Sequence, residues 1–194
     1  MTFKELVLKN RSYRRFHENE AISREQLAEW VDLARNSASG GNAQPLKYLL
    51  SADPKTNELI FPSLKWAGAL PDWPGPSQGE RPAAYIVILL DKSVSQGAGC
   101  DHGIAAQTIL LGAVEKGYGG CMLGAINRDA LRRDLRVPEG FDILLALALG
   151  RPNETIVLEP LPASGSTKYY RDAQSVHHVP KRSLDELIVR PDKK

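Results

Sequence analysis

Apolar residues recur at helical spacing in several stretches of the chain. The clearest stretch follows Ser23, where Leu27, Trp30 and Ala34 repeat every three or four residues, as a helix with one buried face requires. Ser23 and Gln26 also fit a capping box at its start. This pattern predicts a helix at residues 24–35, and shorter helical patterns predict helices at residues 3–8 and 56–69. Residues 103–116 are apolar almost all round and predict a buried helix, and Asn127 is expected to cap a polar helix at residues 128–135.

Continuous apolar runs indicate buried strands. Residues 83–91 and 143–150 are apolar at almost every position, which is typical of strands covered on both faces. Residues 46–51 predict a further strand, and the glycine-rich segment 117–126 leads toward another. The sequence therefore predicts both helices and strands along its length, and it contains no internal repeat.

A proline-rich segment, residues 71–82, is the longest irregular stretch. Loops of this kind inside a compact domain often serve as lids or binding loops. Trp66 and Trp73 flank it, and the sequence leaves open whether they cover a substrate or pack in the core.

The residues from Arg151 onward contain few core-forming runs apart from VHHV and LDELIV. They are too apolar for a disordered tail and too extended to form a second domain. We therefore expect a single domain, residues 1–194, in which residues 151–194 form an arm that packs along another subunit.

The composition is that of an ordinary globular protein. Of the 194 residues, 42% are hydrophobic and 25% are charged, and the net charge is +2. Such a balance predicts neither a nucleic-acid partner nor a membrane partner. No segment has the ~20 apolar residues that a membrane-spanning helix needs.

The compartment is predicted from cysteine usage and from the N-terminal residues. Cys100 and Cys121 are the only cysteines, too few for a disulfide framework. The first residues show no apolar run or cleavage site typical of an export signal. We expect a cytoplasmic protein.

Two segments could bind an anionic or planar ligand. Residues 10–16, NRSYRRF, place cationic groups and a hydroxyl close together, as a phosphate and a ring carbonyl would require. Residues 39–45, SGGNAQP, offer backbone donors and amide side chains. Each has a plainer interpretation, a solvated basic patch for the first and a helix stop for the second.

Other chemistries fit the sequence poorly. Cys100, Asp101 and His102 have no second ligand pair at zinc-site spacing, so no metal site is predicted. His177 and His178 would face opposite sides of a strand. The glycines near residue 120 match neither a dinucleotide-binding motif nor a P-loop, and as they precede the predicted strand they leave only close backbone approach to a ligand.

Taken together, NRSYRRF, ASGGNAQP, GIAAQTILLGAVEKGYGGCMLG and VPKRSLDEL follow the order and spacing of the small FMN-dependent nitroreductases. The chain resembles that family over nearly its whole length. The resemblance implies an α+β sandwich with a mixed central sheet flanked by helices. It also implies a homodimer with shared flavin sites, in which the C-terminal arm is exchanged between subunits.

The resemblance also implies site residues. It assigns cofactor-binding roles to residues of the basic segment, the 39–44 loop, the segment after the buried helix, and the C-terminal region: Arg11, Ser12, Arg14, Ser39, Gly40, Asn42, Gln44, Met122, Leu123, Gly124 and Arg182. Arg14 is expected to act in catalysis by stabilising charge on the reduced flavin, and Arg11 and Arg182 are expected to hold the FMN phosphate. The sequence departs from the family pattern at Asn10, Ala38 and Leu46, so a phosphate contact by Asn10 stays open.

The implied activity is an FMN-dependent oxidoreductase that passes electrons from NAD(P)H to an electron-poor small molecule of nitroaromatic or quinone type, by a ping-pong mechanism. A related flavin reaction, such as reductive dehalogenation, is one alternative. A non-enzymatic protein that stores or senses FMN is another. The physiological substrate and the choice between NADH and NADPH are not encoded in any motif of the sequence.

Overall fold

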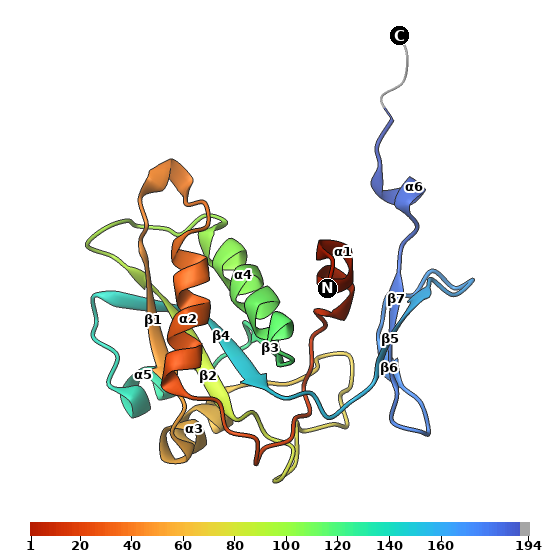
Figure 1. Cartoon of the computed structure of the whole chain (residues 1–194), viewed down its shortest axis with the longest axis horizontal. Coiled ribbons are helices and arrows are strands. Elements are labelled where there is room, and N and C mark those ends of the chain that lie inside the picture. The colour runs from red at the N-terminus through yellow and green to blue at the C-terminus, as the bar shows by residue number, and fades with distance from the viewer. Residues whose placement is uncertain (191–194) are drawn as a thin grey trace. The chain divides into compact units, whose positions relative to one another are not determined.

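The computed structural model describes residues 1–190 and separates into two compact units. The main unit comprises Met1–Trp66 and Pro74–Asn153. The smaller unit comprises Ala67–Trp73 and the residues from Glu154 onward. Figure 1 shows the helices and strands of both units.

The main unit is built on a four-stranded sheet with the order β1-β2-β4-β3. Every pairing in it is antiparallel. The two inner strands are the continuous apolar runs predicted from the sequence. Residues 84–90 of β2 and residues 146–150 of β4 are buried. The strands are β1 (Leu46–Ser51), β2 (Ala84–Asp91), β3 (Gly119–Leu123) and β4 (Phe141–Gly150).

Two helices, α2 (Arg24–Arg35) and α4 (Asp101–Glu115), pack together over one face of this sheet (Figure 1). Ile86 of β2 and Leu147 of β4 lie opposite each other and belong to the same buried cluster as Ile109 of α4. The helices approach closely at Gly112, where an added Cβ would lie 2.6 Å from the Leu33 side chain. Burial of this apolar surface is the main stabilising contribution to the fold.

The remaining helices of the main unit are short. They are α1 (Phe3–Lys9), α3 (Pro54–Ile60) and α5 (Arg128–Leu135). Capping side chains begin each of them, as the capping box of Ser23 and Gln26 begins α2. Leu131 of α5 and Ile60 of α3 are fully buried.

Two expectations need correction. The helix expected at residues 56–69 ends at Ile60 and is followed by a 3₁₀ turn, Phe61–Ser63, because Pro62 has no N–H to continue the α-helical hydrogen bonds. The central sheet was expected to be mixed, yet its four strands are all antiparallel. Parallel and antiparallel pairings occur together in the smaller sheet instead.

The smaller unit holds a three-stranded sheet of order β5-β7-β6. Its elements are β5 (Ile156–Pro160), β6 (Tyr170–Arg171), β7 (His177–Lys181) and the single-turn helix α6 (Leu184–Leu187). Trp73 joins this unit, where the Arg171 guanidinium lies 4.1 Å from its ring centroid. The expectation of a single domain with residues 151–194 as an arm stays a prediction.

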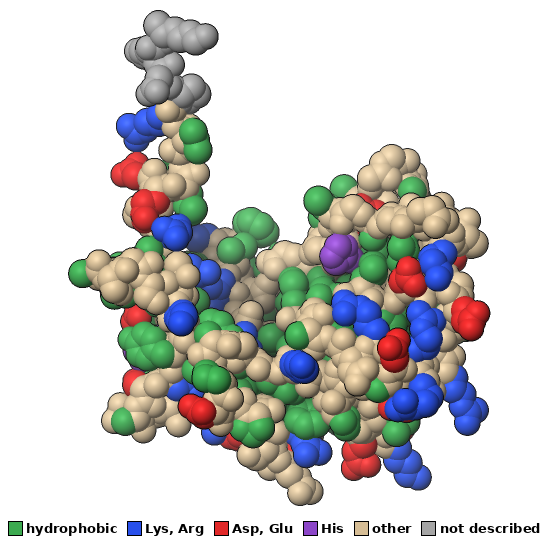
Figure 2. Space-filling model, turned by 180° about the vertical axis from the view of Figure 1, so that it is seen from behind, with side chains coloured by type: hydrophobic (Ala, Val, Ile, Leu, Met, Phe, Trp, Pro, Cys, Tyr) green, Lys and Arg blue, Asp and Glu red, His purple; other side chains and the backbone are tan. Residues whose placement is uncertain are grey.

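The surface carries both apolar and charged side chains. Figure 2 shows lysine and arginine interspersed with aspartate and glutamate, with apolar side chains between them. Among residues 1–190, no helix is long and apolar enough to cross a membrane.

Candidate functional site

The basic segment and strand β3 lie side by side, joined through Gly120. The backbone N–H of Tyr13 donates to the Gly120 carbonyl oxygen at 3.0 Å, and Ser12 forms a parallel bridge with Gly120. Two of the segments singled out from the sequence, more than 100 residues apart, are therefore brought together by backbone contacts.

Glycine is required in β3 because other atoms approach its backbone closely. A Cβ on Gly119 would lie 2.6 Å from the Tyr13 ring, and one on Gly120 would lie 2.5 Å from the Ala148 carbonyl oxygen. Real Cβ atoms essentially never come that close. These glycines lie inside the strand and do not precede it as expected, and the close approach they permit is to the chain itself.

The arginines of the basic segment differ in their partners. Arg11 donates through Nη2 to the Val7 carbonyl oxygen at the end of α1, at 2.8 Å, but its Nε is buried without a hydrogen-bond partner. Arg14 donates through Nη1 to the Ser12 carbonyl oxygen at 3.1 Å. Arg15 forms an ion pair with Glu80 at 2.5 Å. A buried N–H without an acceptor is costly, so the Nε of Arg11 is a candidate ligand contact.

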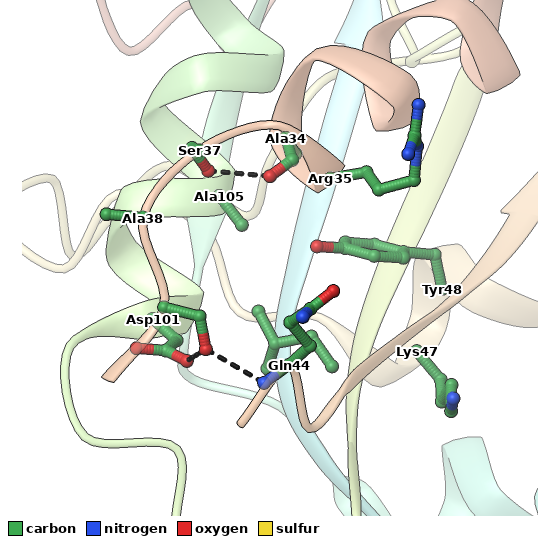
Figure 3. Close-up of a pocket in the computed structure, with 11 residues that line it drawn as sticks. Ala34, Arg35, Ser37, Ala38, Gln44, Lys47, Tyr48, Asp101 and Ala105 are labelled. Atoms are coloured by element: carbon green, nitrogen blue, oxygen red, sulfur yellow. Dashed lines mark hydrogen bonds between the residues drawn. The ribbon is translucent and has the colours of Figure 1, made fainter. Parts of the chain in front are cut away.

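The second site segment, the 39–44 loop, is anchored on the first residue of α4. Ser39 Oγ donates to Asp101 Oδ2 at 2.6 Å, and the Gly40 N–H donates to Asp101 Oδ1 at 2.9 Å. The Gln44 N–H in turn donates to Ser39 Oγ at 2.9 Å. Figure 3 shows the side chain of Asp101 directed toward the loop, with the Ser39–Asp101 and Gln44–Ser39 bonds as dashed lines.

A pocket of about 200 Å³ lies beside this loop, between the end of α2, strand β1 and the start of α4. Tyr48 and Gln44 line it together with Asp101 (Figure 3). Burial, reinforced by the negative charge of Asp101, raises the pKa of Tyr48. The hydrogen bonds from Ser39 and Gly40 lower the pKa of Asp101, so its carboxylate is charged.

A family model for nitroreductases matches residues 7–151. The chain belongs to the nitroreductase family. The matched residues include the basic segment, the 39–44 loop and β3, so the parts of the site described above all lie within the family region. The curated proteins contain no match to the chain.

Solved structures show that the family fold is present. A nitroreductase family protein from Clostridium novyi is 22% identical, with a TM-score of 0.63, and the match covers 96% of this chain and 99% of that one. An NADPH:FMN oxidoreductase from Vibrio harveyi, solved with NAD⁺, is 22% identical with a TM-score of 0.63, covering 83% and 74%. A nitroreductase from Exiguobacterium sibiricum, solved with FMN, is 18% identical with a TM-score of 0.65, covering 79% and 90%.

In this nitroreductase-family chain, the residues expected after the buried helix differ in exposure. Met122 is 36% exposed, whereas Leu123 is buried. Gly124 is exposed, and its carbonyl oxygen accepts from Arg128 Nη2 at 3.3 Å.

The structure brings only some of the expected site residues together. The basic segment is joined to β3, while the 39–44 loop is joined to α4. Arg182 belongs to the smaller unit, where its Nη1 lies 3.3 Å from Glu186.

Asp101 is the residue that sequence reasoning missed. It was considered only as a metal ligand beside Cys100 and His102. Its position as an acidic residue at the predicted start of a helix was a signal of a capping or anchoring role, but nothing in the sequence pointed to the 39–44 loop as its partner.

Proposed function

We propose that this chain is an FMN-dependent oxidoreductase that passes electrons from NAD(P)H to an electron-poor small molecule. Membership of the nitroreductase family supports this, as do two structural neighbours, an NADPH:FMN oxidoreductase and a nitroreductase in complex with FMN. The structural observation that carries the proposal is the buried, unpartnered Nε of Arg11 next to the Ser12–Gly120 bridge.

The residues present fit a flavin mononucleotide. Arg11 has a buried N–H to offer an acceptor, and Ser12 adds a hydroxyl beside it. Asn42 and Gln44 are exposed amides that donate and accept at once, as the edge of a heterocycle with alternating polar atoms requires. Met122 and Gly124 present an exposed side chain and an exposed backbone near the end of β3.

FMN, when bound, would supply the redox chemistry, that is, the transfer of hydride and electrons between donor and acceptor. The chain supplies binding, orientation and charge. Arg11 and Ser12 would hold the cofactor, and Arg14 would supply a permanent positive charge that stabilises the negative charge of the reduced flavin. No side chain is assigned as a general acid.

The proposal includes a homodimer with shared flavin sites, in which residues 151–194 pack on the partner. Exposed apolar residues in the described part of this segment support it, among them Val157, Leu184 and Val189. Arg182 would then contact the FMN phosphate, exchanging its surface pairing with Glu186 for a charge-assisted bond.

A flavin titration of the purified protein tests the proposal. We expect FMN to bind at micromolar concentration or tighter and more strongly than FAD. Arg182→Ala should weaken FMN binding about tenfold to a hundredfold and leave riboflavin binding unchanged, since riboflavin has no phosphate. If neither flavin binds, the proposed function is wrong.

Steady-state kinetics separate an enzyme from a storage protein. With NAD(P)H and an added quinone or nitroaromatic, sustained turnover with parallel initial-rate lines is expected, because donor and acceptor use one site in turn. Flavin binding without turnover of any acceptor would indicate a binding protein, and turnover of halogenated acceptors alone would indicate dehalogenation.

A further inference from the structure

The carboxylate of Asp101 serves the 39–44 loop and not its own helix. Cys100 is the N-cap residue of α4, and its side chain makes no capping hydrogen bond. Asp101 follows as the first helical residue, and both of its oxygens accept hydrogen bonds from the loop, from Ser39 Oγ and from the Gly40 N–H. Asp101 is only 7% exposed, so water competes little with these two hydrogen bonds.

The loop needs an anchor because its backbone is unusual. Gly41, Asn42 and Gln44 have φ values of 57°, 55° and 52°, in the left-handed region that side-chain-bearing residues rarely adopt. Such conformations persist only where surrounding contacts determine them. In this loop the contacts are the backbone hydrogen bonds of a 3₁₀ turn, Gly40–Asn42, together with the bonds that converge on Asp101 and on the Ser39 hydroxyl.

Ser39 links Asp101 to Gln44 through its hydroxyl group. Its hydroxyl donates its single proton to Asp101 and accepts from the Gln44 N–H, so it has no proton left to donate to a ligand. Asn42 and Gln44 are exposed instead, and Gln44 Nε2 donates to Asn42 Oδ1 at 3.1 Å. Ser39 therefore stabilises the loop, and the side-chain amides of Asn42 and Gln44 stay exposed.

We propose that Asp101 is a positioning residue, which fixes the 39–44 loop through Ser39 and Gly40 so that Asn42 and Gln44 are held ready to contact FMN. Ser39 belongs to this support and not to the flavin contacts. The part of the proposal that concerns FMN rests on the proposed function, whereas the anchoring of the loop does not.

Carboxylate chemistry is essential to the anchor. Two donors converge on Asp101, and a carboxylate accepts at both oxygens. Asp101→Asn keeps the size of the side chain but turns one of the two acceptors into a donor, which then faces the Ser39 hydroxyl or the Gly40 N–H. The position of the residue in the first turn of a 15-residue helix further favours negative charge.

Hydrogen exchange on the flavin-free protein tests the anchor directly. In Asp101→Asn we expect the amides of Gly40 and Gln44 to lose protection. Ser39→Ala should lose protection at Gln44 in the same way, and Ser39→Thr, which keeps the hydroxyl, should restore it. The matched control is Asp53→Asn, because Asp53 also accepts two hydrogen bonds from one segment, at the start of α3, and should leave the loop unchanged.

FMN titration of the same variants tests the positioning role. Asp101→Asn and Ser39→Ala should each raise the FMN dissociation constant about tenfold, and the double variant should be no weaker than the worse single variant because the two residues act as one unit. Ser39→Thr and Asp53→Asn should bind as the unmodified protein does. Circular dichroism confirms that each variant is folded.

Two results would overturn the proposal. Unchanged exchange of the Gly40 and Gln44 amides in folded Asp101→Asn would show that the carboxylate does not hold the loop. A loosened loop with unchanged FMN affinity would show that the anchor has no positioning role. Failure of the unmodified protein to bind FMN would instead disprove the proposed function and the positioning role, while the exchange experiment still decides the anchor.

Discussion

The two sheets of this molecule are held together by different forces. In the four-stranded sheet of the main unit, apolar side chains such as Ile86 and Leu147 are fully buried against helices α2 and α4. In the three-stranded sheet of the smaller unit, polar contacts dominate. His178 lies between two carboxylates, with Nδ1 3.0 Å from Glu159 and Nε2 3.0 Å from Asp172.

Other contacts of the smaller unit also involve charged or polar side chains. Arg171 lies 3.2 Å from Glu154 and over the ring of Trp73. His178 also stacks on Tyr170, with ring centroids 4.8 Å apart. Apolar burial is insensitive to pH, whereas ion pairs require particular protonation states. The first sheet should therefore respond to loss of packing volume and the second to changes of charge.

Truncation of a core residue should give the largest effect. Leu147→Ala removes a fully buried side chain and leaves a cavity, so we expect the free energy of unfolding to fall by about 2–5 kcal/mol. Urea denaturation followed by circular dichroism measures it. Leu59→Ala on the exposed face of α3 is the matched control, expected within about 0.5 kcal/mol of the unmodified protein. Equal losses at both positions would contradict the packing argument.

A smaller loss should follow from adding volume where the chain has no room. In Gly120→Ala the new methyl group would overlap the Ala148 carbonyl oxygen and the Leu110 side chain, which should lower the free energy of unfolding by about 1–3 kcal/mol. Because Gly120 also carries the bridge to Ser12, flavin binding should weaken as well.

Gly140→Ala is the control for this change. An added Cβ at Gly140 meets nothing within 4 Å, so stability and flavin binding should stay close to those of the unmodified protein. If Gly120→Ala were equally harmless, β3 would not need its glycines for close approach, and the link between β3 and the basic segment would be weaker than the distances indicate.

Much of the main unit could be predicted from the sequence because its signals are local. The strand at 46–51 and the capped helices at 24–35 and 128–135 have the predicted extents. Strand order and the antiparallel pairing were not predictable, since they depend on contacts between distant residues. The end of α3 at Ile60 was missed although Pro62 stood there as a local signal.

In the candidate site, too, local features could be predicted and contacts between distant residues could not. The basic segment and the 39–44 loop were found from residue types alone, but their anchors were not. Asp101 contacts Gly40, 61 residues earlier in the chain, and a single sequence contains no sign of that pairing. The sequence likewise contained no sign of the hydrogen bond from Ser39 to Asp101.

The last prediction concerns the charge-dependent sheet and has the smallest expected effect. The hydrogen bonds to Asp172 and Glu159 raise the pKa of His178 above its ordinary value. A raised folded-state pKa means that the stabilisation is fully present below the ordinary histidine pKa and is lost as pH rises through the raised value. The hydrogen bond from His178 lowers the pKa of Asp172, so that contribution is lost as pH falls through the lowered value.

Protection of the β6–β7 amides against hydrogen exchange should therefore be greatest at pH values between the lowered pKa of Asp172 and the raised pKa of His178. Protection of the β2 and β4 amides should stay constant over the same pH range. The measurement is exchange over a pH series, corrected for the intrinsic rate. His178→Gln should abolish the decline at high pH, because glutamine does not titrate, and His17→Gln in the main unit is the matched control that should leave the decline in place. A decline that persists in His178→Gln would mean that another group controls this sheet, and a parallel decline in β2 and β4 would remove the contrast between the two sheets.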